Sequence, residues 1–105
     1  LTSSVTKAPF AALHLVSLAP LHEIKVPVLV VHHKQDGCRF TPWDAMPELV
    51  AAFKAAKKAD LMPVEGGREG GNPCHSGYHQ FLGIETTVTD DIAAWIKRYQ
   101  AEAAR

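Results

Sequence analysis

The sequence predicts an α/β fold, in which parallel strands alternate with helices. Residues 28–31 are an unbroken apolar run rich in β-branched residues, and a turn pair follows at 36–37, as expected of a strand buried on both faces. Such strands occur mostly in parallel sheets that helices cover on each side. Residues 60–65, DLMPVE, indicate a second short strand, and residues 84–103 repeat apolar side chains at helical spacing.

We expect the elements to alternate along the whole chain. Parallel strands are expected over about residues 1–5, 26–33 and 60–65, and helices over about residues 9–19, 46–58 and 84–103. This alternation is typical of parallel strands that are joined by crossover helices.

Prolines set two of these expectations. Pro47 would clash inside a helix that began at Pro42, so we expect a turn there, started by the Thr41 hydroxyl as a cap, and then a helix. Pro63 would remove one hydrogen bond from the sheet, which places the strand over 60–65 at an edge.

Composition limits the classes of function. The 105 residues suffice for one small domain, and 47% of them are apolar. Eleven basic residues balance eleven acidic ones, so no overall charge favours a nucleic acid or an anionic membrane as partner. No apolar run approaches the roughly 20 residues that a membrane span needs.

An acid and a histidine follow the two central strands. Asp36 comes directly after the strand over 26–33, and His79 lies between the strand over 60–65 and the last helix. The carboxyl ends of parallel strands meet at one edge of a sheet, where ligands and catalytic groups gather. We therefore expect Asp36 to orient the His79 ring, so that its other nitrogen acts as a general base. The alternative role for Asp36 is that of an ordinary turn residue.

These segments, taken in order, resemble the C-terminal third of an α/β-hydrolase, the superfamily of serine esterases and lipases. The resemblance covers nearly the whole chain and is carried by VPVLVVHH, QDGC with Asp36, DLMPVE, YHQFLGIE with His79, and IAAWIKRY. In that family the chain order is nucleophile, acid, histidine. The resemblance implies that Asp36 and His79 are the acid and the histidine of a triad that hydrolyses carboxylic esters or related acyl compounds, with no cofactor.

The chain departs from the family pattern at the nucleophile. No G-x-S-x-G occurs, and the serines at positions 3, 4, 17 and 76 stand in other contexts. The resemblance thus implies that residues 1–105 form a single domain, the C-terminal part of a hydrolase that lacks the half bearing the nucleophile. We expect no esterase activity from this chain alone. The alternative function is a non-catalytic module that self-associates or binds a small molecule.

His75 competes with His79 as the predicted base. The context favours His79, because Gln80-Phe81-Leu82 after it resembles the family's His-Gly-Phe segment at the start of the last helix. His32 and His33 end a strand, so one is expected to point to each face of the sheet, where packing and backbone hydrogen bonds would explain both.

The two cysteines allow three interpretations. Cys38 and Cys74 lie close along the chain to Asp36 and His79, so the convergence of that pair could bring the sulfurs to bridging distance. A bridge would indicate an oxidising compartment, either periplasmic or extracellular, whereas free thiols would indicate the cytoplasm. Zinc is the less favoured third interpretation, with His75 and His79 completing the ligand set, because neither C-x-x-C nor a helical histidine pair is present.

The expected sheet would have an open edge beside residues 1–5. Unpaired edges invite pairing, so we predict a homo-oligomer, association with an N-terminal part of the same hydrolase, or partial disorder near residues 1–20. The second choice of fold is a flavodoxin-like domain, which no glycine-rich phosphate loop after the first strand supports.

Overall fold

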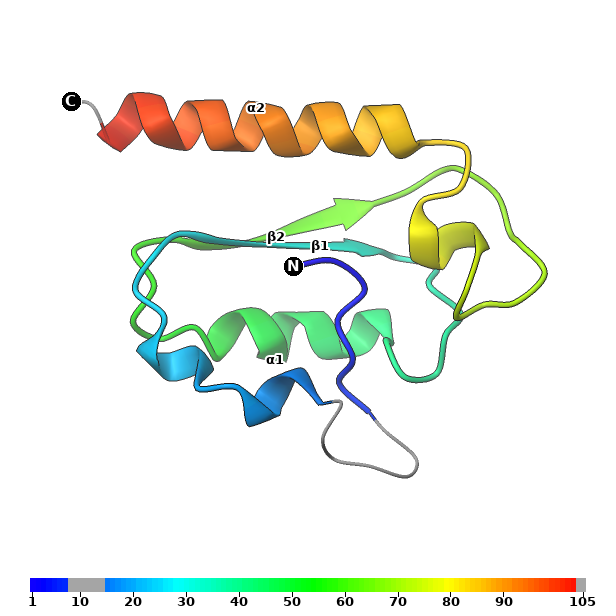
Figure 1. The fold of residues 1–105 in the computed structure, drawn as a ribbon, viewed down its shortest axis with the longest axis horizontal. Coiled ribbons are helices and arrows are strands. Elements are labelled where there is room, and N and C mark those ends of the chain that lie inside the picture. Colours follow the sequence, from blue (N-terminus) through cyan, green and yellow to red (C-terminus); the bar gives the residue numbers. More distant parts are fainter. Residues whose placement is uncertain (8–14, 104–105) are drawn as a thin grey trace.

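The fold has three layers, with a parallel sheet between two helices (Figure 1). The computed structural model describes residues 1–7 and 15–103. Strands β1 (Val28–His33) and β2 (Ala59–Val64) form the middle layer, α2 (Glu85–Ala103) covers one face, and α1 (Met46–Ala51) lies against the other.

The sheet confirms two of the expected strands and their parallel direction. β1 and β2 pair in register from Val28 opposite Ala59 to His33 opposite Val64. All six residues of β1 are buried, as the unbroken apolar run predicts for a strand covered on both faces. Pro63 stands within β2, which pairs with β1 alone among the described residues, so its missing N–H faces an open edge.

The third expected strand, over residues 1–5, does not form in the structure. Thr2 makes one isolated parallel bridge with Val31, while Leu1 donates to the Leu29 oxygen and accepts from the Val31 nitrogen. Ser3 then takes a φ of 47°. That left-handed conformation turns the backbone out of the extended path, so the pairing stops after a single bridge.

The expected helix over 9–19 falls partly on residues 8–14, which lie outside the described residues. The described remainder is not α-helical: η2 (Val16–Leu18) and η3 (Leu21–Glu23) are single 3₁₀ turns on either side of Pro20. Proline at that position lacks the N–H needed to continue one helix through both turns.

The middle helix is shorter than the predicted range of 46–58. α1 ends at Ala51 after six residues, and i→i−3 hydrogen bonds continue the chain in tight turns. The Lys57 nitrogen donates to the Lys25 oxygen, and the Val28 nitrogen donates to the Lys58 oxygen. These bonds fix the start of β2 beside β1, and they override the helical propensity of an alanine- and lysine-rich segment.

The predicted turn before α1 is present, but its cap is not. η4 (Trp43–Ala45) follows Pro42, and no side chain caps its first turn. The Thr41 hydroxyl turns instead into the protein, where the threonine is only 1% exposed.

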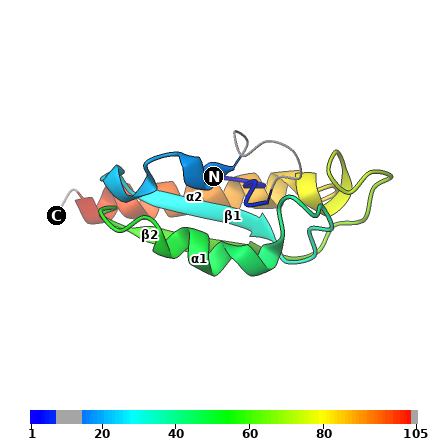
Figure 2. The same ribbon diagram turned by 90° about the horizontal axis from the view of Figure 1, so that it is seen from below.

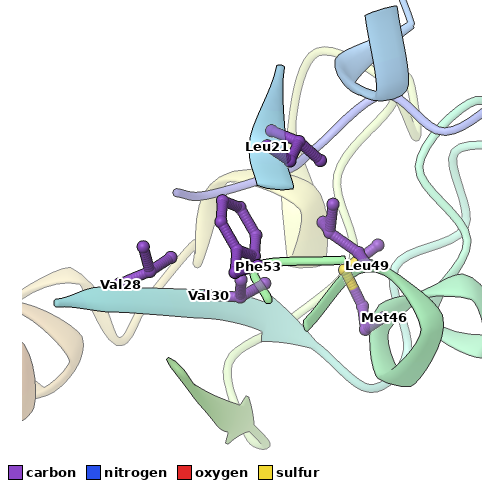
Figure 3. Packing of buried hydrophobic residues seen from close by; sticks show 6 residues of the cluster. All are labelled: Leu21, Val28, Val30, Met46, Leu49 and Phe53. Atoms are coloured by element: carbon purple, nitrogen blue, oxygen red, sulfur yellow. The ribbon is translucent and has the colours of Figure 1, made fainter. Parts of the chain in front are cut away.

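Separate apolar clusters fill the two sides of the sheet. Figure 3 shows the α1 side, where Met46, Leu49 and Phe53 pack on Val28 and Val30, together with Leu21 from η3. On the other side, Leu29, Val31 and Val64 pack against Val88 of α2. The view from below shows α1 running alongside β1, with α2 behind the sheet (Figure 2). No helix in the described part of the chain is long and apolar enough to cross a bilayer.

Candidate active site

Both strands deliver their carboxyl ends to the same end of the molecule (Figure 1). After β1, the Lys34 nitrogen bonds to the Val64 oxygen, and the Asp36 nitrogen bonds to the His33 oxygen, which closes a tight turn. After β2, a long loop leads to η5 (Gly77–Gln80), the 3₁₀ turn that carries His79. The turn after β1 and η5 therefore meet above the ends of the strands.

A glycine allows the loop to enter η5. Gly77 has a φ of +70° and is buried, and a Cβ there would collide with the backbone nitrogen of Gly70. Only glycine allows both the left-handed backbone and the close approach of the two chain segments. This crossing fixes where η5 presents His79.

Asp36 and His79 are in direct contact. His79 Nδ1 lies 3.0 Å from Asp36 Oδ2 and 3.2 Å from Oδ1. The Asp36 side chain is 1% exposed and that of His79 is 13% exposed. The predicted convergence of the two side chains is confirmed. Because an ionised carboxylate only accepts, Nδ1 carries the proton, which leaves Nε2 as the basic nitrogen.

Three further donors surround the Asp36 carboxylate. The Cys38 N–H donates to Oδ1 at 2.9 Å, the Thr41 hydroxyl donates to Oδ2 at 2.9 Å, and His32 Nε2 lies 3.1 Å from Oδ2. Burial raises the pKa of Asp36, but the hydrogen bonds from His32, Cys38, Thr41 and His79 outweigh it, so that the pKa falls below its ordinary value. The buried carboxylate is therefore held in its charged form.

The bond from the Cys38 nitrogen to Oδ1 also makes Asp36 a turn residue of the Asx type. The two interpretations of Asp36 thus describe one side chain: Oδ1 shapes the turn, while Oδ2 faces His79, Thr41 and His32.

The other sequence-predicted histidines lie elsewhere. His75 is exposed in the long loop, and its backbone nitrogen bonds to Asn72. His33 points to the α2 side of the sheet, where Nε2 donates to the Gly66 oxygen and Nδ1 accepts from the Gln35 nitrogen. The backbone role predicted for His33 is confirmed.

His32 was expected only to pack and bond to backbone, but it also contacts the acid. Its ring is wholly buried on the α1 side of the sheet, and Nε2 lies 2.7 Å from the Thr41 oxygen as well as 3.1 Å from Asp36 Oδ2. Thr41 was likewise expected to cap a turn, yet its hydroxyl lies 3.1 Å from His79 Nδ1. The spacing of four residues between His32 and Asp36 across a turn was the one available signal.

The cysteines are paired. Cys38 and Cys74 form a disulfide with Cα atoms 4.7 Å apart, which ties the turn after β1 to the long loop before η5. The bridge leaves neither sulfur as a thiolate, the form that zinc requires. No cluster of three or more histidine, cysteine, aspartate or glutamate side chains in the described residues is arranged to hold a metal.

A pocket of about 200 Å³ opens beside His79, between the turn after β1 and the long loop. Polar side chains and glycines form most of its wall: Gln35, Gly37, Glu69, Gly70, Pro73, Ser76, Gly77, Tyr78 and His79 line it. A group of several non-hydrogen atoms can therefore reach the histidine.

The serines described near the site do not contact the His79 ring through any hydrogen bond. The Ser3 hydroxyl donates to the backbone oxygen of His79 at 2.6 Å, Ser4 is buried without a side-chain partner in the described residues, and Ser76 lines the pocket.

Scans against protein-family models, curated proteins and solved structures find no match for this chain.

Proposed function

We propose that Asp36 and His79 are the acid and the general base of an α/β-hydrolase-type active site that cleaves carboxylic esters or related acyl compounds. The observation that carries the proposal is the contact of 3.0 Å between His79 Nδ1 and Asp36 Oδ2. It joins groups 43 residues apart at the carboxyl ends of two parallel strands, in the chain order acid then histidine.

His79 Nε2 would first accept a proton and then donate it. His79 Nε2 takes the proton from a nucleophile as that group attacks the acyl carbon, and the imidazolium forms against the charged Asp36 carboxylate. The same nitrogen then gives the proton to the leaving alcohol as its bond to the acyl carbon breaks. Nε2 would next take a proton from water, which attacks the acyl carbon, and would return it to the nucleophile as the acid is released. The depressed pKa of Asp36 supports this role, because an acid that stays ionised near the ring stabilises its charged form.

The nucleophile would come from outside these 105 residues, because no G-x-S-x-G occurs in them. The same N-terminal part would supply the remaining strands of the hydrolase sheet beyond β1, on the side where Leu1 and Thr2 now pair. The pocket beside His79 would receive a small part of the substrate. The disulfide supports a location in an oxidising compartment, such as the periplasm or the extracellular space.

The test begins with the coding sequence upstream of Leu1, where we expect a G-x-S-x-G. The longer protein is then assayed with p-nitrophenyl acetate and butyrate. His79→Ala is expected to lower kcat about 10³-fold or more, because it removes the general base. Asp36→Asn should lower kcat about as much, because the ring loses the charge that orients it and stabilises the imidazolium. His75→Ala is the matched control, because this exposed histidine lies four residues before His79, in the loop that leads to η5; it should retain activity within about threefold.

Two results would contradict the proposal. One is hydrolysis by the longer protein that survives His79→Ala. The other is turnover of either ester by the pure 105-residue chain, abolished by His79→Ala, which would show that the nucleophile lies within this chain.

A further inference from the structure

We propose that His32 and Thr41 are positioning residues for this site: together they hold the Asp36 carboxylate in the orientation that accepts the hydrogen bond from His79 Nδ1–H. The inference deepens the proposed function, on which its catalytic part rests. Neither residue would touch the substrate, and both would act through Asp36.

His32 supports the carboxylate from beneath. Its Nε2 lies 2.7 Å from the Thr41 oxygen and 3.1 Å from Asp36 Oδ2, and both of these atoms accept. Nε2 must therefore carry the ring proton and share it between them. The imidazole thus fixes the distance between the backbone of Thr41 and the carboxylate.

Thr41 joins the acid to the base. Its hydroxyl lies 2.9 Å from Asp36 Oδ2 and 3.1 Å from His79 Nδ1, while its backbone oxygen is the main acceptor for His32. Four residues thereby form one connected set, in which a displacement of His32 moves Thr41 and Asp36 together. Low exposure strengthens these bonds, because His32 and Thr41 are 0% and 1% exposed.

Packing alone does not account for the choice of histidine at position 32. The same face of β1 carries Val28 and Val30, which pack into an apolar cluster. The Nδ1 atom of His32 is buried and has no partner in the described part of the chain, an arrangement that costs stability. His33, on the opposite face, has partners for both ring nitrogens. A residue kept for packing or backbone bonding would resemble His33 or an aliphatic side chain.

The test reads the Asp36–His79 pair directly, in the 105-residue chain labelled with ¹⁵N and ¹³C. NMR gives the tautomer of each imidazole and the Nδ1 proton signal of His79. In the parent protein we expect an Nε2–H tautomer for His32 and an Nδ1–H tautomer for His79, whose proton signal is shifted strongly downfield by the carboxylate.

Paired variants separate positioning from stability. His32→Leu should weaken or abolish the downfield His79 proton signal, whereas His32→Gln should restore it, because its amide N–H can replace Nε2–H. Thr41→Val should have the effect of His32→Leu, and Thr41→Ser should behave as the parent. His33→Leu is the control for lost stability: it removes two hydrogen bonds of an equally buried neighbour and should leave the His79 signal in place.

The two Thr41 variants decide the matter if His32→Leu does not fold. An unchanged His79 tautomer and Nδ1 signal in the folded His32→Leu protein, or in Thr41→Val, would overturn the inference. Equal loss of the signal in His33→Leu would also overturn it, because the effect would then follow stability alone.

Activity distinguishes this inference from the function on which it depends. In the longer protein, His32→Leu should lower kcat about 10- to 100-fold with little change in KM, and His32→Gln should recover most of it. Changed NMR signals without any His79-dependent hydrolysis would refute the proposed function and leave the positioning role intact. Hydrolysis that depends on His79 but not on His32 or Thr41 would refute the positioning role in catalysis.

Discussion

At the scale of the residue, the central feature is the buried, ionised carboxylate of Asp36. Four donors reach its two oxygens, and the side chain is almost completely excluded from water. An ionised carboxyl group is costly to bury unless it is fully hydrogen-bonded, so this cluster keeps its charge only while all parts of the site are in place. The site and the fold are therefore linked through the protonation of one residue.

This linkage predicts how stability depends on pH. Because the pKa of Asp36 is lower in the folded protein than the ordinary value of 3.8, its stabilising contribution is complete above about pH 4 and is lost as the pH falls through the folded value. Asp36→Asn should lower the free energy of unfolding by about 2 kcal/mol at pH 7 and flatten its decline below pH 4. Urea denaturation at a series of pH values measures both effects.

Asp44→Asn serves as the control, since Asp44 is exposed on the 3₁₀ turn before α1. It should leave the stability and its acid dependence as in the parent. An Asp36→Asn protein with the same acid dependence as the parent would show that the carboxylate does not couple to folding.

The sequence allowed prediction of Asp36 and His79 because the position of each follows from chain order. An acid after one parallel strand and a histidine after the next must meet at the same edge of the sheet. The roles of His32 and Thr41 depend on how the turn after β1 folds back over the end of that strand, and the spacing of four residues between His32 and Asp36 does not by itself define that path. Because His32 and His33 are adjacent, the sequence does not show which of the two faces Asp36.

At the scale of the element, the disulfide joins two segments that carry the site. Cys38 lies in the turn after β1 and Cys74 in the loop that leads to η5, so the bridge couples the Asp36 side of the pocket to the His79 side. The Cys38 backbone N–H also donates a hydrogen bond to the Asp36 carboxylate.

The size of the closed loop predicts what the bridge contributes. A sequence separation of 36 residues corresponds to a stabilisation of about 4 kcal/mol through the lost entropy of the unfolded chain. The double variant Cys38→Ala with Cys74→Ala should lose about that amount, a large share of the about 5–15 kcal/mol typical of small domains. Thermal and urea unfolding, with and without a reductant, measure the loss.

The reductant provides the internal control. It should destabilise the parent protein to nearly the level of the double variant and should leave the double variant unchanged. The pairing would be contradicted if reductant left the stability of the parent protein unchanged and two thiols could be alkylated in the denatured, unreduced protein.

The elements that the sequence predicted best are those with many repeats of one pattern. α2 begins one residue later than expected and ends at the predicted residue, because apolar side chains at regular spacing cover the sheet along its length. α1 was predicted at twice its observed length. Its end is decided by two backbone hydrogen bonds to the segment around β1: the Lys57 nitrogen donates to the Lys25 oxygen, and the Lys58 oxygen accepts from the Val28 nitrogen. Such long-range bonds leave no local trace in the sequence.

At the scale of the whole molecule, β1 has unequal neighbours. β2 pairs with it over six residues, whereas on its other edge the pairing ends after Thr2. Large apolar side chains are also exposed, including Leu1 at 51%, Leu18 at 56% and Val26 at 64%. An uncovered edge and exposed apolar groups both favour association with another chain.

We therefore predict that the 105-residue chain self-associates. Light scattering after size-exclusion chromatography should give at least twice the monomer mass of 11.4 kDa at micromolar concentration. Val26→Glu should shift the population towards monomer, because a charge on that surface disfavours contact, whereas the exposed Ala101→Glu on α2 should not. A monodisperse monomer whose residues 1–7 resist hydrogen exchange would contradict the prediction.

The parallel direction of the sheet followed from sequence because a strand buried on both faces needs helices above and below it. The extent of the third strand could not be predicted, because Thr2, Ser3 and Ser4 do not alternate between apolar and polar side chains. The left-handed backbone at Ser3 ends the pairing with β1. The layers were thus predictable from burial, and the extent of pairing was not.

The two tryptophans of the chain occupy opposite layers. Trp43 packs on the α1 side with its ring 6.4 Å from that of His32, and Trp95 of α2 donates its indole N–H to Asp60 at 2.7 Å. Intrinsic fluorescence therefore offers two separately placed reporters. Trp43→Phe and Trp95→Phe would each leave one indole as the reporter. Fluorescence unfolding curves of the two variants would show whether the α1 side of the sheet, next to His32 and Asp36, loosens before the α2 side.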